Sequence, residues 1–67
     1  MYNYILKRIE HNEGNLEKVK DGKLSKSSIN MSLGALVELQ FLIDYTDLTT
    51  IERNELRHKI RLVIEDQ

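Results

Sequence analysis

The chain has 67 residues, of which 40% are apolar and 31% are charged, and its net charge is -1. This length allows one domain, and the combination of a high apolar fraction with a low net charge excludes a disordered tail. The absence of cysteine excludes a disulfide scaffold and a thiolate metal site. No apolar run approaches the length of a membrane span. What remains is one small globular domain, and we expect no contact with a membrane.

A domain of this size has a thin core, and small domains commonly add disulfides, a metal ion or self-association to it. Disulfides are excluded by the composition. His11 and His58 are the two histidines, and they are not spaced as ligands on one helix face, so we expect no metal and no other cofactor. Self-association remains, and a homo-oligomer is therefore the expected state.

Residues 2–20 predict one helix. Apolar residues recur at steps of three and four, and Asn12 fills the gap in the series. Gly14 interrupts the pattern at a cost of about 1 kcal/mol, and a turn over 12–15 is the alternative. Because the register continues across the glycine, we expect an unbroken helix, whose apolar positions are Tyr2, Ile5, Ile9, Leu16 and Val19.

The pair Asp21-Gly22 predicts the end of this helix, because glycine favours the position just after a helix C-terminus. A polar connection over 22–27 follows. Serine is a common N-cap, because its hydroxyl accepts a hydrogen bond from the first turn of the helix. The candidate N-caps of the next helix are therefore Ser25, Ser27 and Ser28.

Residues 28–45 predict a second helix that is apolar around most of its circumference. Its polar side chains are scattered, and a helix of this kind is normally enclosed by neighbours. Residues 29–34 also alternate as a strand would, but one short strand has no partner strand in this chain. Two flanking helices cover only part of such a helix, so large side chains remain exposed, among them Met31, Phe41, Leu42 and Tyr45.

A third helix is predicted over 50–64. Thr49 and Glu52 match a capping box, with the threonine as N-cap and the glutamate three residues later. Ile51 and Leu62 lie on nearly the opposite side of the helix from its main apolar seam. That seam consists of Leu56, Ile60, Val63 and Ile64, and it is flanked by Arg53, Arg57 and Arg61.

These elements predict an all-α fold in which residues 1–67 form one domain, a small three-helix antiparallel bundle. Apolar area left on a monomer marks a partner surface, and a second copy related by a two-fold axis is the simplest partner. We therefore expect a helical homodimer; the alternative is a compact monomer with an apolar surface. The candidate dimer interface is Met31, Phe41, Leu42, Tyr45, Ile51 and Leu62.

The sequence does not predict an enzyme or a small-molecule substrate. Catalysis needs titratable groups that converge in a cleft, and three helices of this length leave little room for one. We expect His11 to be solvated beside Glu10 and Glu13, and His58 to be solvated or at the rim of an interface. The glycines are isolated, so no phosphate-binding loop is predicted. No catalytic, cofactor-binding or metal-binding residue is therefore proposed from the sequence.

Basic residues form two groups, a lysine cluster over 18–26 and the arginine stripe of Arg53, Arg57 and Arg61. Such groups bind phosphates in nucleic-acid-binding proteins. The expected use of the stripe is different, because arginines at this spacing pair with nearby glutamates and extend their stems over an apolar seam. Binding of nucleic acid is therefore the second hypothesis.

The first hypothesis is a small regulatory or accessory protein that binds a protein partner and inhibits or recruits it, as small helical proteins of phages and other mobile elements do. The alternatives are a nucleic-acid-binding transcriptional regulator and a purely structural oligomerisation module. The sequence starts at Met1 without a secretory signal or a lipidation motif, which predicts a cytoplasmic location. The candidate partner-binding residues are Tyr2, Tyr4, Arg53, Arg57 and Arg61.

Overall fold

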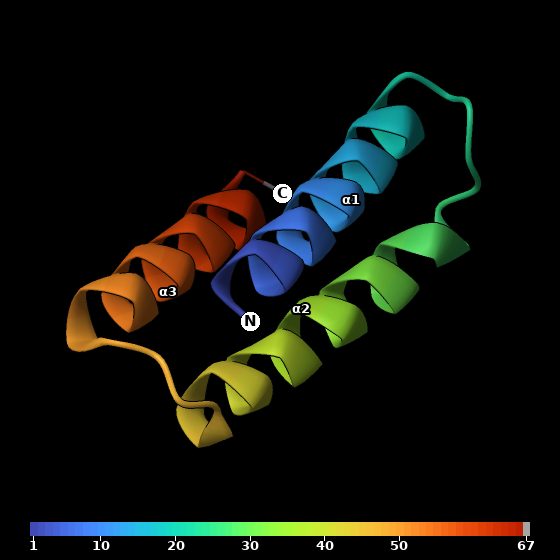
Figure 1. Cartoon of the computed structure of the whole chain (residues 1–67). Helices are drawn as coiled ribbons and strands as arrows, with labels where there is room; N and C mark the ends of the chain where they lie inside the picture. Colours follow the sequence, from blue (N-terminus) through green and yellow to red (C-terminus); the bar gives the residue numbers. More distant parts are fainter. Residues whose placement is uncertain (67) are drawn as a thin grey trace.

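The computed structural model describes residues 1–66, and these form three helices: α1 (Tyr2–Lys20), α2 (Ser27–Tyr45) and α3 (Thr50–Glu65). Figure 1 shows the chain running up α1, down α2 and up again along α3. Contacts at both ends place α1 and α3 side by side and parallel, because Tyr2 meets Glu55 and Lys20 meets Asp66. The all-α three-helix bundle is thus confirmed, with helix ends within one residue of those predicted.

Helix α1 is continuous through Gly14, as its unbroken register predicts. Its buried positions are spaced as a heptad seam, and Asn12 occupies one of them. The Nδ2 atom of Asn12 donates a hydrogen bond of 2.8 Å to the carbonyl oxygen of Arg8. This bond satisfies a polar group that would otherwise destabilise the core.

Gly22 ends α1 in the left-handed conformation, with φ of 78°. The amide of Lys23 donates to the carbonyl of Lys18 at 2.8 Å, and the amide of Gly22 donates to that of Val19 at 3.0 Å. This pair of bonds is a Schellman motif, which requires a residue of positive φ. The predicted stop at Asp21-Gly22 is therefore confirmed.

The start of α2 differs from the prediction. Its N-cap is Lys26, and no serine side chain caps the helix. A capping hydroxyl needs an N-cap residue in the extended region, whereas Lys26 is already helical, with φ of -62° and ψ of -24°. The hydroxyls of Ser25 and Ser27 bond to each other instead, at 2.7 Å.

The start of α3 is as predicted. The Thr49 hydroxyl accepts a hydrogen bond from the Glu52 amide at 3.1 Å, and the Glu52 carboxylate accepts one from the Thr49 amide at 3.0 Å. The two bonds satisfy two amides that a helix N-terminus leaves without partners. The capping box is thus complete.

All three helices contribute to one core, and α2 contributes Leu36, Leu39 and Ile43. Leu48 also joins it, although it lies in the connection between α2 and α3 and the helical patterns did not include it. Its burial holds the connection between α2 and α3 against the core. The other buried apolar residues are Ile5, Ile9, Leu16, Leu56, Ile60 and Val63.

Replacing Gly14 by alanine is expected to stabilise the fold. A methyl group at this position meets no atom within 4 Å outside its own helix turn, and alanine is better than glycine inside a helix by about 1 kcal/mol. We expect the free energy of unfolding in urea to rise by about 0.5 to 1 kcal/mol. Gly22→Ala is the matched control; it should lower this free energy because of its positive φ.

Candidate interaction surfaces

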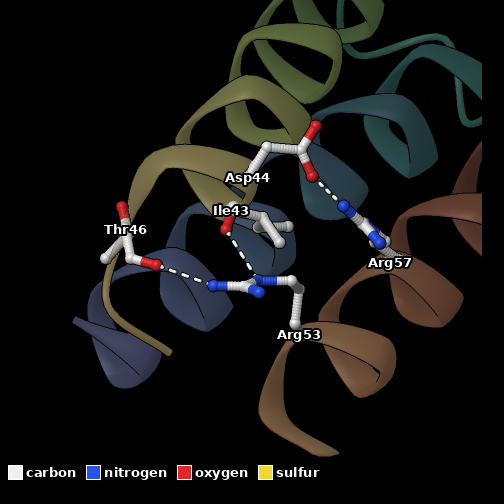
Figure 2. Close-up of polar contacts among 5 residues, drawn as sticks. All are labelled: Ile43, Asp44, Thr46, Arg53 and Arg57. Carbon is white, nitrogen blue, oxygen red and sulfur yellow. Dashed lines mark hydrogen bonds and ion pairs between the residues drawn. The ribbon is translucent and has the colours of Figure 1, made fainter. Parts of the chain in front are cut away.

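Arg53 ties the start of α3 to the end of α2 (Figure 2). Its Nε atom donates to the Ile43 carbonyl at 3.2 Å, and an Nη atom donates to the Thr46 carbonyl at 3.0 Å. Helix α2 has no basic residue in its last turn, and the final carbonyls of a helix lack partners within it. The guanidinium therefore acts as a C-terminal cap supplied by the next helix.

Arg57, one turn further along α3, forms an ion pair with Asp44 of α2 (Figure 2). Both side chains are about half exposed, and such pairs contribute little to stability, roughly 0 to 1 kcal/mol. Within residues 1–66, the side chain of Arg61 makes no ion pair or hydrogen bond. The predicted arginine stripe is thus divided, and the expected pairing with glutamates is wrong, because Arg53 meets backbone carbonyls and Arg57 meets an aspartate.

An open hollow of about 360 Å³ lies along α3 and is lined by Asn54, Arg57, His58 and Arg61. All four residues come from one helix, at spacings of three and four, so they share one side of it. The hollow contains hydrogen-bond donors but no carboxylate, and its two arginines are the part of the stripe that faces solvent.

Helix α2 exposes large apolar side chains on the side that faces away from the core. Met31 is 78% exposed, Phe41 60% and Tyr45 87%, and Val37 is also exposed. At 100° per residue these four positions lie within an arc of about 120°, so they form one surface. We call Met31, Val37, Phe41 and Tyr45, together with the residues between them on this side, the α2 outer face.

Leu42 does not belong to this face. It is half-buried and packs against the core, so it has less exposed area for the predicted dimer interface than Met31, Phe41 or Tyr45. Its position lies on the flank of α2 between the outer face and the buried seam. Leu42 therefore contributes to the fold and offers little area to a partner.

Helix α3 exposes a second, smaller apolar surface. Ile51 is 71% exposed and Leu62 is 52% exposed, both on the side opposite the buried seam. His58 lies between them along the helix and is exposed as well. We call these three residues the α3 outer face. The candidate interface residues thus belong to two separate surfaces on different helices.

The two tyrosines proposed as partner anchors lie in different surroundings. Tyr4 is 55% exposed. Tyr2 is half-buried against the core, and its hydroxyl donates a hydrogen bond of 3.1 Å to Glu55 of α3. This hydrogen bond and the nearby carboxylates raise the pKa of Tyr2 above its ordinary value. Tyr2 therefore joins two helices, and of these two tyrosines Tyr4 has the exposed ring.

Neither histidine is placed with other ligating side chains. Across residues 1–66, no group of three or more His, Asp or Glu side chains is arranged to hold a metal ion. His11 is exposed and lies 3.4 Å from Asn15, one turn later in α1.

Across residues 1–66, no helix has both the length and the apolar character needed to cross a membrane.

The described residues thus define a small three-helix bundle with apolar outer faces on α2 and α3. Comparison of the chain with protein-family models, with curated proteins and with solved structures gives no match. An inference about function therefore rests on the exposed surfaces of the described residues.

Proposed function

We propose that this chain is a small regulatory or accessory protein that acts by binding another protein, and that it assembles as a homodimer. The observation that carries the proposal is the exposure of large apolar side chains on two separate surfaces, the α2 outer face and the α3 outer face. Contiguous apolar area of this kind marks protein interfaces on soluble domains.

The two surfaces suit two different contacts. The α2 outer face is the larger and carries two aromatic side chains, which supply the most contact area. We assign it to self-association. The α3 outer face adjoins the donor-lined hollow, so it combines apolar anchors with groups that orient a partner. We assign it to a second protein, which is inhibited or recruited by occupation of its surface.

Affinity capture with matched variants tests this assignment. Leu62→Asp, which places a charge on the α3 outer face, is expected to reduce capture of a specific cellular protein at least tenfold, because an unpaired charge is costly in an apolar interface. Asn3→Asp is the control: it makes the same change of net charge at an exposed site of α1 and is expected to leave capture unchanged. Equal capture by wild type and Leu62→Asp would contradict the assignment.

Nucleic-acid binding through the arginine stripe is supported by one feature, the donor-lined hollow with Arg57 and Arg61. The use of Arg53 as a helix cap and the neutralisation of Arg57 by Asp44 argue against it, because phosphate binding draws on several free cations. A salt-dependent shift of DNA mobility by the wild type, lost in Arg61→Gln, would favour this alternative over the first.

A further inference from the structure

We propose that the α2 outer face pairs with the α2 helix of a second copy in an antiparallel arrangement, with Tyr45 of each copy packed over the partner's Gly34. The inference rests on the homodimer proposed above and adds the surface and the orientation to it. It predicts which residues of the two copies lie opposite one another.

The spacing along α2 is symmetric. Gly34, Glu38, Phe41 and Tyr45 follow one another at steps of four, three and four residues along the side facing away from the core. Steps of three and four keep side chains on one seam of a helix pair. This order of steps is the same when read in either direction. A two-fold axis between Glu38 and Phe41, perpendicular to α2, therefore places the line of one copy antiparallel to the same line of the other. Gly34 then lies opposite the partner's Tyr45, and Glu38 opposite the partner's Phe41.

The sizes of the facing side chains also match. A methyl group at Gly34 would meet no atom within 4 Å outside its helix turn, and its φ is not positive. Gly34, like Gly14, thus has room for a side chain in the single subunit, and at Gly34 this room lies on the α2 outer face. Tyr45, at the other end of the line, is 87% exposed. Antiparallel pairing places the largest exposed side chain over the position with no side chain.

Charge favours the same orientation. Glu38 is the one ionised group on this line, and Asp44 at its edge is already paired with Arg57. Parallel pairing would set each Glu38 against the partner's Glu38 at the same level. Antiparallel pairing sets each carboxylate beside the partner's Phe41, where it stays unpaired and weakens the dimer, but it separates the two carboxylates along the helix axes and brings opposite ends of the helix dipoles together. Like-charge repulsion is therefore smaller in the antiparallel pair.

The exposed area predicts a reversible dimer. With about 200 Å² for each aromatic side chain, Phe41 and Tyr45 expose about 300 Å² per copy, so about 600 Å² in the pair. Stable specific interfaces bury about 1,200 Å² or more in total. Met31 and Val37 extend the surface on its two sides. The aromatic area of the pair therefore falls below that of a stable interface, so we expect a weak dimer that dissociates on dilution.

Cysteine cross-linking tests the orientation, because the chain contains no cysteine of its own. One preparation carries Gly34→Cys and another carries Tyr45→Cys. In the proposed pair these two positions face each other across the interface, whereas the two copies of position 34 are separated by about 16 Å along the helices. A disulfide needs Cα atoms within about 7 Å. A dimer of one Gly34→Cys copy and one Tyr45→Cys copy also keeps one unaltered contact between Tyr45 and the partner's Gly34.

We expect mild oxidation of the equimolar mixture to give at least ten times more disulfide-linked dimer than either variant alone. Ile51→Cys, at an equally exposed site on α3, measures random oxidation and should give only background. Strong cross-linking of either variant alone would overturn the antiparallel arrangement. A wild-type dimer in sedimentation, with the mixture at background, would overturn the choice of face but not the homodimer. Monomeric wild type at millimolar concentration would overturn both.

Discussion

Leu36→Asp is expected to unfold the chain, with loss of the helical circular dichroism signal at 25 °C. Leu36 is fully buried in the core, at 0% exposure. Its removal costs about 2 to 5 kcal/mol, and a carboxylate buried there adds the cost of desolvation. Domains have roughly 0.05 to 0.15 kcal/mol of stability per residue, which gives about 3 to 10 kcal/mol for a chain of this length. The substitution therefore removes most or all of the stability.

Leu62→Asp is the matched control, since it makes the same chemical change on α3 where the side chain is half exposed. It is expected to leave the helical signal intact and to change the free energy of unfolding by less than about 1 kcal/mol. Equal loss of helicity in the two variants would contradict the assignment of these leucines to core and surface.

The helices were predictable because their signals are local. The repeat of apolar residues along α1 continues across Gly14, and the capping box of α3 lies within four residues. The exposure of Phe41 and Tyr45 was also predictable, because two neighbours cannot enclose a helix that is apolar on most sides. Each of these inferences needs only the order of residues and the geometry of a helix.

The features missed by the sequence depend on how the helices meet. Leu48 is buried because the chain between α2 and α3 passes over the end of the core, and one leucine in a connection has no periodicity to reveal this. Leu42 is half-buried because it packs against the core residues. Arg53 reaches acceptors ten and seven residues earlier in the chain. No spacing rule within one helix predicts that contact.

Arg53→Met is expected to lower the free energy of unfolding by about 1 to 3 kcal/mol. The half-buried guanidinium makes two hydrogen bonds, to the carbonyls of Ile43 and Thr46. Methionine is about as long as the apolar part of the arginine side chain, but it leaves both carbonyls without this donor. A buried acceptor without a partner costs about 1 to 3 kcal/mol. Urea unfolding followed by circular dichroism measures the loss. The end of α2 should also lose protection in hydrogen exchange first.

Two further variants separate this capping role from a general effect of charge. Arg57→Met removes a neighbouring arginine whose ion pair with Asp44 is about half exposed, so its cost should stay below about 1 kcal/mol. Arg53→Lys keeps the positive charge but replaces the planar fork, so one ammonium group cannot span both carbonyls as the guanidinium does. It should recover part of the lost stability. If Arg53→Met costs no more than Arg57→Met, the link between α2 and α3 does not depend on this cap.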